Sequence, residues 1–198
     1  MSEPSPEATE QFLESIRDDE VGLFVSFVKQ NDRFAHVIAL IQGEDCTPLF
    51  ASIEGSRDDQ DWPESPPLQE LHIEERGDRA VALLVGKAGH SHWSTAVEPT
   101  AEPGRLRFSV ACRMQDYPVR ICSRYGTLDD AKLEPTLEKD GPWVWQINGV
   151  EVCVDVIPQE QFPTPELPAT ANGFEVNASL DLEPFPKTIQ WLYEIWVR

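Results

Sequence analysis

Two histidines separated by one residue form the one metal-like spacing in this chain of 198 residues. The pair is His90 and His92, and Glu98 follows on the same run. Residues two apart on a β-strand point to the same side, so all three side chains would share one face. Imidazoles with a carboxylate are a common ligand set for a divalent transition metal. The spacing therefore predicts one candidate site, in which His90 and His92 hold a metal for a metal-assisted enzyme.

The segment His90-Ser91-His92 resembles the first motif of cupins, in which an H-x-H pair is followed by a glutamate. Here five residues separate His92 from Glu98, where the cupin pattern has three or four, and no second-motif histidine follows. Along an extended strand Glu98 would lie about 20 Å from His92, so a shared ion would require a bulge or a bend. The alternative interpretation is two exposed histidines beside a turn, with no cofactor.

Five arginines between residues 105 and 125, where the one acid is Asp116, form a second candidate site. These candidate ligand-binding residues are Arg105, Arg107, Arg113, Arg120 and Arg124. Guanidinium groups on neighbouring strands can hold a carboxylate or a phosphate through paired hydrogen bonds, which favours a small anionic ligand. Alternatively, the arginines neutralise Asp and Glu on adjacent strands or loops. Arginines that faced a barrel interior would favour the ligand, because buried arginines need partners.

Two of the six tryptophans are candidates for a stacking surface. Trp62 lies in an acidic, proline-rich segment, and Trp196 lies on the minority face of the last expected strand. Either indole could contact a sugar or a protein partner. The other tryptophans considered, Trp93, Trp143 and Trp145, fall on expected core faces and predict packing.

The net charge of −19 limits the classes of partner. Nucleic acid and anionic membrane surfaces would be repelled by such an acidic protein. The five arginines and one acid of residues 105–125 leave that segment at +4 and the rest of the chain at −23, so a small anionic ligand remains compatible. Adaptation to high salt is another explanation of the acidity.

The sequence predicts a soluble, cytoplasmic protein. The start, MSEPSPEATE, lacks the features of a secretory signal, and no apolar run approaches the roughly 18 residues of a membrane span. The four cysteines have no metal-like or redox spacing, and we expect free thiols. They are Cys46, Cys112, Cys122 and Cys153.

The elements that must position these residues are mostly β-strands, because apolar residues recur with a period of two from Val21 onward. Asn148-Gly149 predicts a two-residue type I′ hairpin that pairs Trp145 with Val152. Alternation predicts further strands at 47–54, 91–98, 105–114, 119–125, 174–180 and 188–198.

Two weaker hairpins follow the same logic. The turn at residues 76–79 would pair Ile73 with Ala82. The turn at residues 30–33, if its loop has two residues, would pair Phe27 with His36 and place His36 on the core face. A buried imidazole there is more simply a hydrogen-bonded core residue than a ligand.

The predicted fold is all-β, an antiparallel meander of about 10–12 strands forming a barrel or a two-sheet sandwich, with a short N-terminal helix. Residues 1–20 are expected to form an acidic arm, with Phe12, Leu13 and Ile16 on one stripe of that helix. Residues 21–198 would form one β domain with proline-rich loops at 56–67 and 158–173. The last strand is apolar on both faces and should be central or covered.

No catalytic serine motif or glycine-rich phosphate loop occurs in the chain. The favoured function is therefore a non-enzymatic domain that binds a small ligand or a protein partner. The metal-assisted enzyme remains the alternative.

Overall fold

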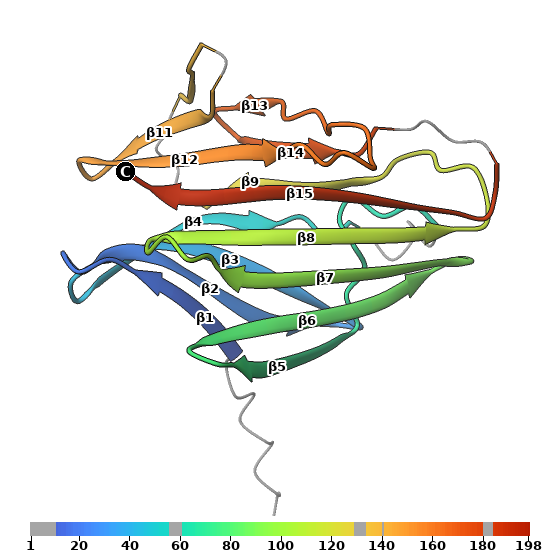
Figure 1. The fold of residues 1–198 in the computed structure, drawn as a ribbon, viewed down its shortest axis with the longest axis horizontal. Coiled ribbons are helices and arrows are strands. Elements are labelled where there is room, and N and C mark those ends of the chain that lie inside the picture. Colours follow the sequence, from blue (N-terminus) through green and yellow to red (C-terminus); the bar gives the residue numbers. More distant parts are fainter. Residues whose placement is uncertain (1–10, 56–60, 129–133, 140, 180–183) are drawn as a thin grey trace, which may run out of the picture.

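The computed structural model describes residues 11–55, 61–128, 134–139, 141–179 and 184–198. These residues form fifteen strands in two antiparallel sheets (Figure 1). The two-sheet sandwich is thus confirmed, and the closed barrel is wrong, because seven strands and eight strands form separate sheets. Across the described ranges there is no helix of the length and apolarity that a membrane crossing requires.

The seven-stranded sheet has the order β1-β2-β3-β4-β9-β14-β13. Its strands are β1 (Gln11–Ile16), β2 (Val21–Gln30), β3 (Arg33–Gln42), β4 (Asp45–Ser52), β9 (Cys122–Thr127), β13 (Ala169–Thr170) and β14 (Gly173–Asn177). The consecutive strands β1 to β4 form a meander, and β9 returns to this sheet beside β4.

The eight-stranded sheet has the order β10-β11-β12-β15-β8-β7-β6-β5. Its strands are β5 (Glu70–Arg76), β6 (Arg79–Ala88), β7 (Ser91–Pro99), β8 (Arg105–Met114), β10 (Thr136–Leu137), β11 (Trp143–Ile147), β12 (Val150–Ile157) and β15 (Lys187–Val197). Figure 1 shows β5, β6, β7, β8 and β15 lying one above the other across the molecule. The last strand, β15, lies between β8 and β12, which confirms its predicted central position.

All three predicted hairpin registers are confirmed. Trp145 pairs with Val152 across the Asn148-Gly149 turn, where both turn residues have positive φ. The hairpin at residues 76–79 pairs Ile73 with Ala82, and the hairpin at residues 30–33 pairs Phe27 with His36. In each case a two-residue turn and the alternation of apolar residues specify the same register.

The predicted N-terminal helix is wrong where the structure describes it, because residues 11–16 form β1 and pair with β2. Leu13 and Ser15 are buried, whereas Phe12 is 50% exposed and Ile16 is 39% exposed. The apolar residues that predicted a helical stripe therefore belong to an edge strand. Leu13 faces the core, and Phe12 and Ile16 lie on the exposed side of that strand. The segment before residue 11, including the expected helix start near Thr9, lies outside the described residues.

The residues directly after the first proline-rich segment connect the two sheets, and the second proline-rich segment extends one of them. Leu68 accepts a hydrogen bond from the backbone of Phe34 in β3, and Gln69 donates one to Val85 in β6, so residues 68–69 bridge the two sheets. Residues 158–173 include β13, and Glu166 pairs with Asn177 at the end of β14. This segment therefore continues the edge of the seven-stranded sheet.

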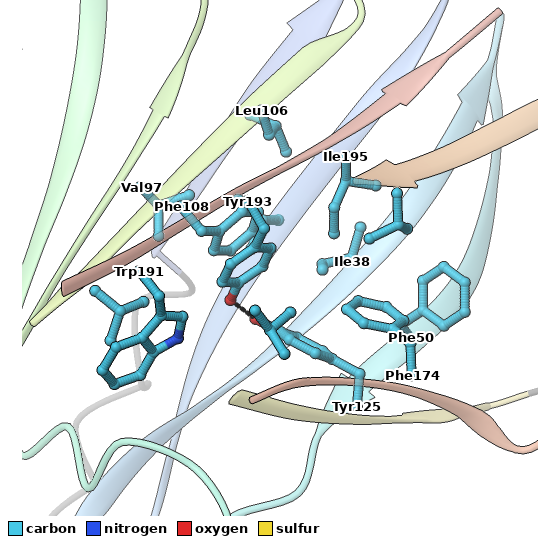
Figure 2. Close-up of a cluster of buried hydrophobic side chains, with 14 of the residues drawn as sticks. Ile38, Phe50, Val97, Leu106, Phe108, Tyr125, Phe174, Trp191, Tyr193 and Ile195 are labelled. Atoms are coloured by element: carbon cyan, nitrogen blue, oxygen red, sulfur yellow. Dashed lines mark hydrogen bonds between the residues drawn. The ribbon is translucent and has the colours of Figure 1, made fainter. Parts of the chain in front are cut away.

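The core lies between the inner faces of the two sheets, as Figure 2 shows. Phe108, Trp191 and Tyr193 come from the eight-stranded sheet and face side chains of the other sheet, including Phe50 and Tyr125. The outer faces of the sheets are left to carry surface residues.

Candidate functional site

The arginines of β8 lie on the outer face of the eight-stranded sheet. The alternating residues, Leu106, Phe108, Val110, Cys112 and Met114, are buried in the core. Arg105, Arg107 and Arg113 therefore face outward, as the alternation predicts, and the condition that would place them inside a barrel is not met. Whether each binds a ligand depends on the carboxylates around it.

Arg105 and Arg107 are already paired with a buried carboxylate on the neighbouring strand. Glu194 of β15 is only 3% exposed. It accepts a hydrogen bond of 2.9 Å from Arg105 Nη1 and one of 2.8 Å from Arg107 Nε. A carboxylate buried to this extent needs such partners. The two arginines therefore neutralise an internal charge.

Arg105 also contacts Trp196. The Arg105 guanidinium lies 4.4 Å from the centroid of the Trp196 ring, a cation–π arrangement. The other candidate indole, Trp62, packs against the hydrophobic core and is partly buried. The structure thus places these two tryptophans apart and gives each an internal contact.

Arg120 and Arg124 lie with the seven-stranded sheet, away from the arginines of β8. Both form ion pairs with Glu64, Arg120 at 3.4 Å. Arg124 also approaches Glu175 of β14, with its Nε 3.5 Å from the carboxylate. The arginine cluster of the sequence is therefore divided between two sheets, because β8 and β9 are consecutive in the chain but belong to different sheets.

Arg113 differs from the other four arginines. It is exposed at one end of β8, opposite His92 of β7, and His92 lies opposite Lys87 of β6. Thr188 of β15 completes this cross-strand row on the other side of Arg113. Within the described residues, no carboxylate forms an ion pair with Lys87, His92 or Arg113. We call these three side chains the cation row, after the two cations, Lys87 and Arg113, that flank His92.

The cation row lines a surface hollow of about 470 Å³. The hollow also contacts Gln69 and Glu70 at the edge of the sheet, and Thr188 on the opposite side. Adjacent strands are about 4.8 Å apart, so a bound anion of carboxylate size could contact two side chains of the row at once. This is the chemistry that the sequence assigned to the arginine cluster, now restricted to one of its members.

The hollow continues into a shallow trough on the same outer face, of about 360 Å³. Its floor consists of small side chains of β7 and β8, namely Ser94, Ala96, Ser109 and Ala111. Larger side chains rise on both sides, Leu83 and Val85 from β6 and Gln190 and Leu192 from β15. Val85 is 47% exposed, so the trough presents apolar surface to solvent. Val85, Ser94 and Ala111 line both the trough and the hollow.

The residues of the predicted metal site do not come together. His90 lies in the turn before β7, where its Nδ1 is 3.1 Å from Asp116 Oδ2. His92 lies between two cations, and Glu98 lies opposite Arg107 at the far end of β7. No group of three or more His, Cys, Asp or Glu side chains suited to a metal occurs among the residues placed by the structure.

A buried polar chain in the core is the remaining group of titratable residues. His36 Nε2 and Tyr125 Oη are 2.6 Å apart, and the Tyr125 and Tyr193 hydroxyls are also 2.6 Å apart. Burial lowers the pKa of His36 to about 4 and raises the pKa values of both tyrosines. All three side chains are enclosed by the core, which confirms the predicted core position of His36. These three hydrogen-bonded residues therefore have a packing role.

Sequence reasoning missed Lys87 and Thr188. The signal for Lys87 was present, because a two-residue turn at Gly89-His90 places Lys87 directly opposite His92. Thr188 depends on the pairing of β15 with β8, which no local pattern specifies. Comparison of the chain with protein-family models, curated proteins and solved structures found no match.

Proposed function

We propose that this protein is a non-enzymatic binding protein that holds a small anionic ligand in the hollow beside the cation row. One observation carries the proposal. Arg105, Arg107, Arg120 and Arg124 each contact a carboxylate, whereas the cation row has no ion pair with any described carboxylate. In a chain of net charge −19, acidic partners are abundant, so two neighbouring cations, Lys87 and Arg113, without a described carboxylate partner favour an external anion.

Lys87 and Arg113 lie on the two strands that flank β7, each opposite His92. A bound anion between them would offset the repulsion of these two like charges. Glu70 also lines the hollow from the edge strand, without an ion pair to the row. Screening over about 8 Å at physiological ionic strength prevents the distant acids from excluding an anion.

Inorganic phosphate is the simplest probe of this hollow. We expect a titration followed by amide NMR shifts to move residues of β6, β7 and β8 around the row. The Arg113→Gln variant should bind phosphate at least about tenfold more weakly, since a charge-assisted hydrogen bond is worth roughly 1.5–3 kcal/mol.

The matched control is Arg79→Gln, which removes the same charge from an exposed hairpin on the same sheet. Its phosphate affinity should equal that of the unmodified protein. Equal weakening in both variants would mean that net charge alone governs binding and would overturn the proposal. Shifts confined to other surfaces would overturn it as well.

A further inference from the structure

We infer that the ligand is amphiphilic, a single-chain alkyl carboxylate whose head group binds the cation row and whose apolar chain lies in the trough. The inference rests on the proposed function of the hollow and specifies the class of ligand. It is carried by the continuity of a cationic hollow with an apolar trough on one sheet face.

The two ends of the trough differ in charge. At one end, Arg113 and Lys87 have no carboxylate partner among the described residues. At the other end, the cross-strand row of Glu98, Arg107 and Glu194 already holds two carboxylates, and Arg107 forms an ion pair of 2.7 Å with Glu194. A carboxylate head group is therefore favoured at the cation row alone, and its chain must extend toward Glu194.

The dimensions suit an alkyl chain of moderate length. From His92 to Ala96 along β7 is four positions, as is the distance from Arg113 to Ser109 along β8. At about 3.3 Å per residue, the floor of small side chains extends roughly 13 Å from the cation row. Its small side chains leave room for a chain one methylene wide between Val85 and Gln190.

An extended peptide fits this trough less well. A peptide gains its main-chain hydrogen bonds at the edge of a sheet. Both β7 and β8 are paired on both sides, so the trough floor offers no free strand edge. A peptide backbone lying there would find two serine hydroxyls, of Ser94 and Ser109, and would leave most of its N–H and C=O groups without a partner. An alkyl chain has no such groups to satisfy.

The test compares butanoate with octanoate, below the concentration at which octanoate forms micelles, by amide NMR titration of the full chain. Full burial of one methylene raises affinity about fourfold, and a trough open on one side buries about half of it. Octanoate, with four more methylenes, should therefore bind at least about tenfold more tightly than butanoate. Octylamine, with the same chain and the opposite charge, should not bind in the trough.

Two variants separate the head-group site from the trough. Ala96→Leu fills the trough floor and should abolish the advantage of octanoate while leaving butanoate and phosphate binding unchanged. Ala101→Leu, at an exposed position in the loop after β7, is the size-matched control and should behave as the unmodified protein. Thermal unfolding of both variants confirms that each is folded.

The outcomes distinguish the two proposals. Binding of phosphate and butanoate with no gain for octanoate would overturn the amphiphilic ligand and leave the anion-binding function standing. Binding of none of the three anions would overturn both. Equal binding of octylamine and octanoate would show that the cation row does not orient the chain, which also contradicts the inference.

Discussion

Burial shifts the pKa values of His36 in β3 and of Glu54 just after β4 in opposite directions, each toward the neutral form. His36 has its pKa lowered to about 4, because the core desolvates the imidazolium form. Glu54 has its pKa raised to about 7, again mainly by burial, although the Ser52 hydroxyl donates a hydrogen bond to its carboxylate. Ser52 also accepts a hydrogen bond from the His36 amide, so one serine links the two residues.

These opposite shifts should cancel in mildly acidic solution. Between about pH 4.5 and 6.5, unfolding protonates His36 and ionises Glu54, so the net uptake of protons by this pair is zero. The Glu54→Gln variant removes the proton release by Glu54 and leaves the proton uptake by His36. Relative to the unmodified protein, its free energy of unfolding should rise by roughly 3 kcal/mol as the pH increases from 4.5 to above 7.

The sign follows from the pKa of Glu54. Its folded-state pKa is raised above the unfolded value, so the carboxylate destabilises the fold increasingly as the pH passes from 4.5 to 7, and glutamine relieves that cost. Chemical denaturation at several pH values measures the difference. His36→Gln should show the opposite slope, and parallel stability curves for Glu54→Gln and the unmodified protein would contradict the prediction.

At the scale of elements, one glycine controls how the segment before β5 packs on β6. An added Cβ at Gly86 would lie 1.7 Å from the Pro67 carbonyl oxygen, an impossible contact. The same backbone segment continues to Leu68 and Gln69, which hydrogen-bond to β3 and β6. Gly86 therefore permits the close approach through which this segment joins the two sheets.

Gly86→Ala should accordingly lower the free energy of unfolding by about 1–3 kcal/mol or more, the usual cost of overpacking. Gly126→Ala in β9 is the control, because its new Cβ would lie at an ordinary 3.5 Å from Ile53 Cδ1. That variant should change stability by less than about 1 kcal/mol. Urea denaturation measures both variants. A small effect of Gly86→Ala on the free energy of unfolding would contradict the prediction, because it would show that the segment moves aside without loss of stability.

The success of sequence prediction also varies with the element. The hairpins were predictable because the turn residues and the apolar alternation are local and agree, as at Asn148-Gly149. The N-terminal strand was not, because Phe12, Leu13 and Ile16 fit a helical stripe equally well. Which sheet each strand joins depends on long-range pairing, so the separation of Arg113 from Arg124 could not be predicted from their proximity in the chain.

At the scale of the whole molecule, 35 acidic residues outnumber 16 basic ones, and the described cations are mostly paired. Exposed ion pairs such as Arg198 with Glu138 contribute about 0–1 kcal/mol each. Repulsion among the remaining acids of a −19 chain should exceed these contributions at low salt.

We therefore expect sodium chloride to raise the free energy of unfolding between 50 mM and 1 M, as screening shortens the Debye length from more than 10 Å to about 3 Å. Urea denaturation at both salt concentrations measures the change, with potassium chloride as a check on cation identity. A loss of stability on adding salt would show that the ion pairs dominate.

The central place of β15 has a consequence for how the protein is made. Before residues 187–197 leave the ribosome, the eight-stranded sheet exists only as two separate groups, β5 to β8 and β10 to β12. The partner of Arg105 and Arg107, Glu194, arrives with that same strand. Long-range pairing of this kind is slow compared with local hairpin formation. We expect the local hairpins to form first and the sandwich to assemble only after β15 has been synthesised and has paired with β8 and β12.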